Sequence, residues 1–378
     1  ASVTFLFLLV VGLNGMPLQA TGTAVVESWT LKDAVDDNIV YSNLMALYDS
    51  TEGNNWSQRW NWGNTSVSYC RWYGVCCNGV LTRSDSCPLP NWEVGNFSGS
   101  CCDSSGNLTS ISLVDNNLVG QIPSEVGNLL TLRSILLFEN QLSGTIPASF
   151  QQLVNLQRLA LFGNALTGTI PAFLGDLSEL VSIRIYSNPL EGSIPPNLGK
   201  LRKLKYLVLR ANQLSGTIPP EISNISSLEE LVLADNMLQG SIPSSFGLLT
   251  QLRILYLFSN QLSGTIPPEI SQLQKLVNIA LYSNKLTGAI PENIGGTTAT
   301  VGIYLAGNQL SGTIPSSIGE LASLQVFSAD HNMLSGTLPD TFARSSSIRQ
   351  ILLRGNQLTG SIPPEFGSYT PILEVLDL

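Results

Sequence analysis

Apolar and polar positions repeat along most of the chain with a period of 24 residues. Between positions 108 and 363 an Asn recurs at this spacing eleven times, and each is followed by Leu after two positions, Gly after four and Pro after seven. Apolar residues precede most of these Asn residues by five and three positions, as Ile135 and Leu137 precede Asn140. This alternation predicts a short strand with inward-facing Leu and Ile in every copy. The Asn column comprises Asn116, Asn140, Asn164, Asn188, Asn212, Asn236, Asn260, Asn284, Asn308, Asn332 and Asn356.

A single 24-residue copy cannot bury its own apolar face, so the copies are expected to stack as coils around one continuous core. With parallel strands about 4.8 Å apart, the stack is predicted to be roughly 50 Å long. An inward Asn amide can donate to and accept from backbone groups that the bend leaves unpaired. We therefore interpret the Asn column as structural. The Gly column is expected to supply a positive-φ bend, and the Pro column to end a second short extended run.

The repeated pattern L-x-x-L-x-L-x-x-N-x-L-x-G-x-I-P, from Leu108 to Pro363, resembles the plant-type leucine-rich repeat. The resemblance implies an α/β solenoid, a right-handed curved superhelix of about eleven coils with a parallel β-sheet on its concave side. The preceding "CRWYGVCC" resembles the N-terminal cap motif of that family, which implies a Cys70–Cys77 disulfide and a Trp72 packed against the first coil. "LMALYDSTEGNNW" resembles the cap helix of leucine-rich-repeat proteins of algae and other protists.

The segment before the repeats holds all six Trp and all six Cys, which sets a domain boundary near Leu108. It departs from the family by an additional Cys76 and by a stretch that carries Cys87, Cys101 and Cys102. Six cysteines allow fifteen connectivities, so the pairing of these four stays open. An amphipathic helix is predicted in the same segment, with Ile39, Val40, Leu44, Leu47 and Tyr48 on one face.

The chain is expected to divide into four parts. Residues 1–24 contain an apolar run followed by small residues, which indicates a secretory signal peptide whose start precedes residue 1, with a buried core helix as the alternative. Residues 25–107 form the cap and residues 108–371 the repeats. Residues 372–378 restart the strand pattern, so we expect the protein to continue into a cap, a membrane span or a kinase domain, or to end soon after.

Composition narrows the function classes. Charged residues make up 12% of the chain and the net charge is −9, which disfavours nucleic acid and anionic membrane surfaces as partners. The single histidine, His331, and the lack of clustered Cys, His and carboxylates predict no metal, no cofactor and no catalytic centre. Five glycosylation sequons fit a secreted chain: Asn55, Asn64, Asn96, Asn107 and Asn224.

The positions six, four, two and one before each column Asn are expected to face outward on the concave sheet. Eight aromatic residues occupy them, and exposed aromatic side chains on a rigid face favour ligand binding. The alternative is that aromatics merely suit strands. Three arginines step diagonally across neighbouring coils beside them and favour an acidic or carboxylate-bearing partner. The predicted binding residues are Phe138, Phe162, Tyr186, Tyr206, Tyr256, Phe258, Tyr282, Tyr304, Arg158, Arg184 and Arg210.

A second outward face follows each column Asn. The positions three and five after it hold Ser or Thr in eight and nine of the eleven coils, and Glu191, Gln239 and Ala289 interrupt the array. Such a regular hydroxyl ladder resembles the ice-binding face of solenoid antifreeze proteins. The pairs are exemplified by Ser143 and Thr145, Thr167 and Thr169, Ser215 and Thr217, Ser263 and Thr265, and Ser311 and Thr313.

The sequence therefore predicts an extracellular, non-enzymatic recognition module that binds a protein, peptide or glycan on its concave face. The family resemblance implies the ectodomain of a receptor-like protein or receptor kinase, or a secreted inhibitor of cell-wall-degrading enzymes such as polygalacturonase. A surface or matrix protein without a specific ligand and an ice-binding protein are the further alternatives.

Overall fold

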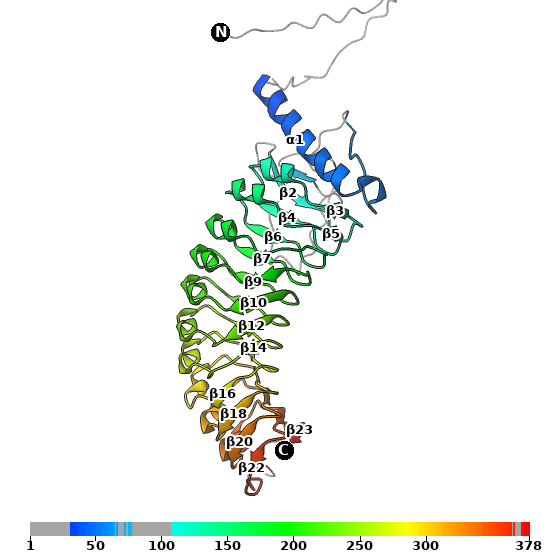
Figure 1. The fold of residues 1–378 in the computed structure, drawn as a ribbon. Coiled ribbons are helices and arrows are strands. Elements are labelled where there is room, and N and C mark those ends of the chain that lie inside the picture. The colour runs from blue at the N-terminus through cyan, green and yellow to red at the C-terminus, as the bar shows by residue number, and fades with distance from the viewer. Residues whose placement is uncertain are drawn as a thin grey trace, which may run out of the picture. The chain divides into compact units, whose positions relative to one another are not determined.

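The structure is a computed structural model that describes residues 31–64, 66, 72, 75–77, 107–364, 366 and 372–378. The chain forms two units, residues 1–39 and residues 40–378, and the first contributes the beginning of helix α1 (Leu31–Ser50). Everything below concerns the second unit, a curved stack of coils with the strands on one side and short helices on the other (Figure 1). The predicted signal peptide lies outside the described residues.

The predicted cap helix is present as α1, and it begins at Leu31, before the first residue of the predicted apolar face, Ile39. Its residues Leu44 and Leu47 are fully buried in the core. Trp72 is also fully buried, with its ring 5.3 Å from that of Tyr41 and 5.0 Å from that of Trp62. This aromatic group joins the cap to the first coil, as the family resemblance implied for Trp72.

The main sheet runs through every coil. Its strands follow the order of the sequence and pair in parallel, except that β1 pairs antiparallel with β2 and so closes the first coil. Residues that face each other on neighbouring strands are 24 positions apart at most steps, as Ile254 and Asn278 are. The strands are β1 (Val75–Cys77), β2 (Leu108–Ser112), β4 (Ser134–Leu136), β6 (Arg158–Ala160), β7 (Ser182–Arg184), β9 (Tyr206–Val208), β11 (Glu230–Val232), β13 (Ile254–Tyr256), β15 (Asn278–Ala280), β17 (Gly302–Tyr304), β19 (Val326–Ser328), β21 (Gln350–Leu352) and β23 (Val375–Asp377).

Smaller parallel sheets follow the column Asn. They end no later than the residue after the column Gly, so the extended run stops before the column Pro, which was expected to end it. Their strands are β3 (Val119–Gln121), β5 (Gln141–Ser143), β8 (Glu191–Gly192), β10 (Gln213–Thr217), β12 (Met237–Gly240), β14 (Gln261–Leu262), β16 (Thr287–Ala289), β18 (Gln309–Gly312), β20 (Met333–Gly336) and β22 (Gln357–Leu358).

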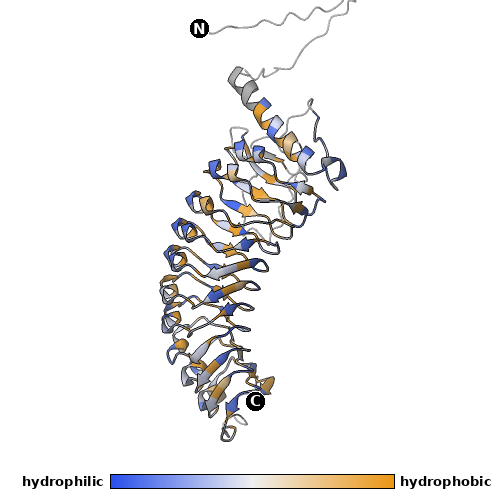
Figure 2. Cartoon of the chain, viewed as in Figure 1, coloured by the Kyte–Doolittle hydropathy of each residue, from blue (hydrophilic) through white to orange (hydrophobic). Residues whose placement is uncertain are grey.

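Short 3₁₀ helices form the convex side. Except for η1 in the cap and η10, each begins directly after the column Pro, whose fixed φ suits the residue before a helix. An apolar residue of each helix from η3 onward, such as Phe150 or Phe246, points into the core between the sheets. Figure 2 shows the resulting alternation of hydrophobic and hydrophilic residues within each coil. The helices are η1 (Gly53–Asn55), η3 (Ser124–Asn128), η4 (Ala148–Gln152), η5 (Ala172–Asp176), η6 (Pro196–Lys200), η7 (Pro220–Asn224), η8 (Ser244–Leu248), η9 (Pro268–Gln272), η10 (Ile294–Gly296), η11 (Ser316–Glu320) and η12 (Asp340–Arg344).

The Asn column ties each coil to the one before it. The Asn260 amide nitrogen donates to Leu233 O at 3.0 Å in the preceding coil and to Leu257 O at 3.1 Å in its own, while its oxygen accepts from Leu238 N at 3.0 Å. Asn188 repeats this arrangement. These bonds satisfy backbone groups at the bend, so the column serves the architecture rather than a ligand.

The position just before each column Asn has positive φ in all eleven coils. Three of these residues are glycines and the other eight are small or polar, from Asp115 at 46° to Glu139 at 54° and His331 at 51°. The sequence pattern predicted only that this column faces outward; the structure adds that its left-handed backbone excludes β-branched residues there.

Candidate ligand-binding site on the concave sheet

Stacked aromatic rings line the N-terminal half of the concave face. Phe138, Phe162 and Tyr186 stand two positions before successive column Asn residues, so the strand spacing places them one above another. Their ring centroids are 4.2 Å apart at both steps, and the rings are nearly parallel, at 15° and 8°. Both faces of the Phe162 ring are therefore covered by neighbouring rings.

The same column continues across a gap. Ala234 has no ring to stack, and the Arg210 guanidinium crosses this position to lie 5.3 Å from the Phe258 ring centre. The Nε of Arg210 is 2.7 Å from a carboxylate oxygen of Asp235, which holds the guanidinium in place. Phe258 then stacks on Tyr282 at 4.4 Å. Arg210 thus stands in the same column between the two groups of rings and contacts the second group; we call this column, from Phe138 to Tyr282, the ring ladder.

A second cationic contact crosses the middle of the face. Arg184 lies over the Tyr206 ring at 5.1 Å and reaches Glu230, two coils on, at 3.5 Å. Its buried Nε has no hydrogen-bond partner among the described atoms. Arg158 lies on strand β6, where burial lowers the pKa of its guanidinium while Tyr206 acts in the opposite direction.

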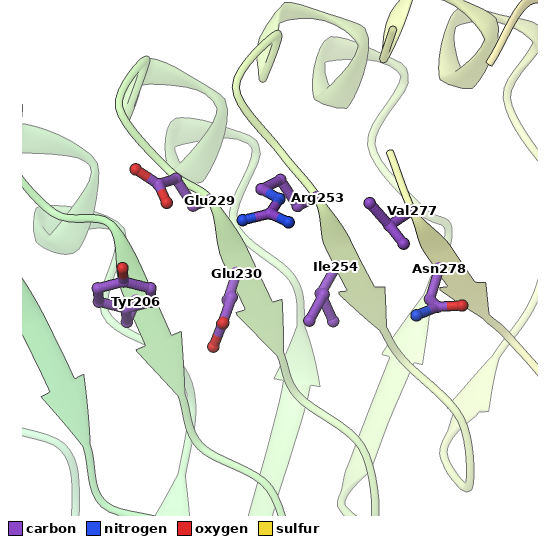
Figure 3. A pocket seen from close by; sticks show the side chains of 7 residues that line it. All are labelled: Tyr206, Glu229, Glu230, Arg253, Ile254, Val277 and Asn278. Carbon is purple, nitrogen blue, oxygen red and sulfur yellow. The ribbon is translucent and has the colours of Figure 1, made fainter. Parts of the chain in front are cut away.

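Beside the ladder the face is hollowed. The hollow has a volume of about 160 Å³ and opens between the starts of strands β9, β11, β13 and β15. Figure 3 shows one residue from each strand and the residues just before three of them converging on it. The lining residues are Tyr206, Glu229, Glu230, Arg253, Ile254, Val277 and Asn278.

Tyrosines next to the hollow are partly shielded from water. Burial raises the pKa of Tyr256, and the neighbouring Tyr304 and Glu230 raise it further, while a hydrogen bond from Asn278 acts against them. Burial, followed by the nearby Asp235, likewise raises the pKa of Tyr282. Both phenols are therefore neutral hydrogen-bond donors at physiological pH.

The structure corrects one part of the sequence prediction. All eleven predicted binding residues lie on the concave strands or directly after them, but Phe138, Phe162 and Phe258 are only 4%, 2% and 8% exposed. They were expected to offer exposed contact area, and stacking at the strand spacing buries them instead. The five tyrosines and the arginines border them and remain partly or fully exposed. The hollow was missed, because Arg253 and Val277 stand seven positions before their column Asn, outside the columns considered.

The hydroxyl ladder forms a regular second face. The position five after the column Asn is exposed in every coil from Thr145 to Ser361. Inner hydroxyls donate to a Gly carbonyl of the preceding coil, as Ser143 does to Gly120 at 3.0 Å and Thr167 to Gly144 at 3.2 Å. These bonds fix the orientation of the hydroxyls.

Other predicted sites have mixed outcomes. The sequon residues Asn55, Asn64, Asn107 and Asn224 are exposed, while Asn96 lies outside the described residues. The cysteine side chains, and with them the Cys70–Cys77 disulfide, also lie outside them. In the described part of the chain, no three His, Cys, Asp or Glu side chains converge as they must to hold a metal ion.

Sequence and structure comparisons agree with this geometry. A family profile described as "Leucine rich repeat" matches residues 202–262, and a second with the same description matches residues 107–129, 131–153, 301–321 and 347–369. The ectodomain of the plant membrane receptor kinase GASSHO1/SCHENGEN3 from Arabidopsis thaliana, in complex with CASPARIAN STRIP INTEGRITY FACTOR 2, superposes with a TM-score of 0.76 at 31% identity, over 86% of this chain. The chain belongs to the leucine-rich-repeat family. No enzyme family is indicated.

Two further solved structures are similar to this leucine-rich-repeat chain. The Arabidopsis receptor kinase HAESA, in complex with the peptide hormone IDA and the co-receptor SERK1, has a TM-score of 0.75 at 33% identity over 91% of the chain. A plant ice-binding protein has a TM-score of 0.69 at 25% identity over 90% of the chain. The chain spans 36% of the GASSHO1 chain and 53% of the HAESA chain, but 98% of the ice-binding protein. No curated protein matches. Among the described residues, no helix is long and apolar enough to cross a membrane.

Proposed function

We propose that this leucine-rich-repeat solenoid is an extracellular recognition module whose concave face binds a peptide or an extended protein segment. The observation that carries the proposal is the column of stacked rings with Arg210 between its two groups, beside a polar hollow, on strands held rigid by the Asn column. A prepacked surface loses little side-chain entropy on binding. The similarity to receptor ectodomains in complex with peptide hormones supports the same role.

The ladder favours a peptide over a glycan. Sugars pack on the open faces of aromatic rings, yet rings on both sides cover Phe162, and Tyr282 and Arg210 cover Phe258. Around these two rings, the partly exposed tyrosines and the hollow are accessible. These groups suit the amides and side chains of an extended peptide.

The receptor setting follows from similarity rather than from the site. We propose the ectodomain of a receptor-like protein or receptor kinase, because the two Arabidopsis neighbours are receptor kinases. A secreted inhibitor of cell-wall-degrading enzymes is one alternative. A matrix protein without a specific ligand is another, and in that case no saturable binding is expected. Sequencing the full-length transcript separates a membrane-anchored chain from a secreted one.

The concave site is tested with a displayed library of random peptides selected on the immobilised protein. Replacing Tyr282 and Tyr304 together by Ser should abolish binding of the enriched peptides, because it removes two partly exposed phenols. The matched control replaces Thr265 and Thr313 by Ala on the second face of the same region and should bind like wild type. Failure to enrich any peptide, or equal binding by the concave variant, refutes the proposal.

Ice binding through the second face is a second candidate. Over the last five coils, from Ser263 to Ser361, nine of ten ladder positions carry hydroxyls, and the plant ice-binding protein matches almost over its full length. The expected result is thermal hysteresis that survives the concave double variant but disappears when Thr313 and Thr337 become Lys. A wild-type protein without hysteresis excludes this candidate.

A further inference from the structure

The charges around the hollow do not balance. Glu229 is paired with Lys205 at 2.8 Å, and this carboxylate raises the pKa of the Lys205 ammonium through their hydrogen bond and their attraction. Glu230 is paired with Arg184 at 3.5 Å. Arg253 is the third cation. The lining itself holds two carboxylates and one cation, but both carboxylates are paired with cations outside the lining, so Arg253 is the one charged group of the lining that has no charged partner among the described residues.

The excess charge lies on Arg253. Figure 3 shows its side chain between those of Glu229 and Val277, yet no carboxylate oxygen among the described residues lies within 4.0 Å of its guanidinium. Arg184 and Arg210 are each held by an acid and by a ring, Arg210 by Asp235 and Phe258. Arg253 is exposed and keeps its planar fork of donors available.

The remaining wall of the hollow is both apolar and polar. Ile254 and Val277 offer an aliphatic surface beside Arg253, and Tyr206 and Asn278 add polar groups at the two ends. A volume of about 160 Å³ accommodates one medium-sized side chain. A Glu or Asp fits this set, because its methylene groups pack on the aliphatic surface while its carboxylate meets the guanidinium.

We propose that the hollow binds an acidic side chain of the peptide, with Arg253 as its specificity-determining contact. This inference rests on the proposed function of the concave face. The ring ladder extends to both sides of the hollow, from Phe138 to Tyr282. A ligand lying along the ladder therefore places interior residues at the hollow rather than its C-terminal carboxylate.

The test uses peptides displayed with their C-termini fused, so that any carboxylate contribution comes from side chains. Enriched peptides should share a Glu or Asp. Synthetic copies in which that residue is replaced by Gln or Asn should bind wild type about tenfold or more weakly, since charge-assisted bonds are among the strongest single contacts. On the Arg253→Gln variant, acid and amide peptides should bind equally, whereas Arg253→Lys should keep part of the preference.

Arg133→Gln is the matched control. Arg133 occupies the same position of its coil, seven before the column Asn, and is exposed but five coils from Arg253. It should retain the full acid preference. Peptides that need Tyr282 and Tyr304 but show no acid preference overturn this inference alone, as does a preference unchanged in Arg253→Gln. Failure to enrich any peptide overturns the proposed function and this inference together.

Discussion

Two glycines of the repeat offer a sharp test of how the coils pack. Gly240 and Gly264 occupy the same position in successive coils, with φ of 79° and 75°. A Cβ added at Gly240 would lie 2.9 Å from Cγ2 of Thr217, whereas at Gly264 the nearest atom is Cβ of Ser241 at 3.4 Å. Both Ala variants therefore carry the same backbone strain, but only Gly240→Ala creates a steric overlap. The methyl of Thr217 alone distinguishes them.

The expected magnitudes follow from these two contributions. Left-handed backbone costs Ala about 1–2 kcal/mol, partly offset by about 0.4–1 kcal/mol from a less flexible unfolded chain. Gly264→Ala should thus lose about 1 kcal/mol of unfolding free energy, and overpacking should cost Gly240→Ala at least about 1 kcal/mol more. Thr217 is β-branched and has few rotamers with which to avoid the overlap.

Urea denaturation followed by circular dichroism measures both losses, provided that the dependence on urea concentration stays unchanged. Thr217→Ser should remove most of the additional loss when combined with Gly240→Ala, as judged against Thr217→Ser alone. Equal losses at the two glycines, or no coupling between positions 217 and 240, would refute the packing argument.

Two further perturbations address the Asn column and the tyrosines. Asn260→Ala should lower the unfolding free energy by about 3 kcal/mol or more, because one buried N–H and two carbonyls lose their hydrogen-bond partner. Amide hydrogen exchange at Leu238 should become faster, and an unchanged exchange rate would contradict this explanation. The folded-state pKa of Tyr256 lies above the unfolded value of about 10, so its contribution to stability is complete below that pH and is lost as pH rises through the folded pKa. Tyr256→Phe should therefore lose less stability than wild type between neutral and strongly alkaline pH, and parallel curves would count against a shifted phenol.

The scaffold was predictable because each structural demand recurs at the same position in every coil. Asn260 and its counterparts repeat since every bend has the same unpaired backbone groups. The left-handed column illustrates a signal that was present but unused. Residues such as Glu139 and Ser187 differ chemically, yet the column contains no β-branched residue, and that exclusion indicates positive φ.

The concave site was less predictable because its properties depend on pairs of coils. The sequence places Phe138 and Phe162 in one outward column, but only their 4.2 Å separation reveals that they cover each other. Likewise, the sequence gives no sign that Arg210 spans Ala234 to reach Phe258. Side chains two coils apart interact here, and examining each repeat position separately does not reveal contacts of that length.

The spacing of the strands explains why these rings stack where they do. Parallel strands place equivalent residues about 4.8 Å apart, close to the distance at which aromatic rings pack face to face. Adjacent aromatics in one column therefore cover each other's faces, whereas an Ala, as at position 234, opens a gap that a long cation can cross. A ligand that meets this ladder finds side chains already ordered by one another. Its selectivity must then come from positions outside the ladder, where Arg253 keeps a charge that no neighbouring carboxylate neutralises.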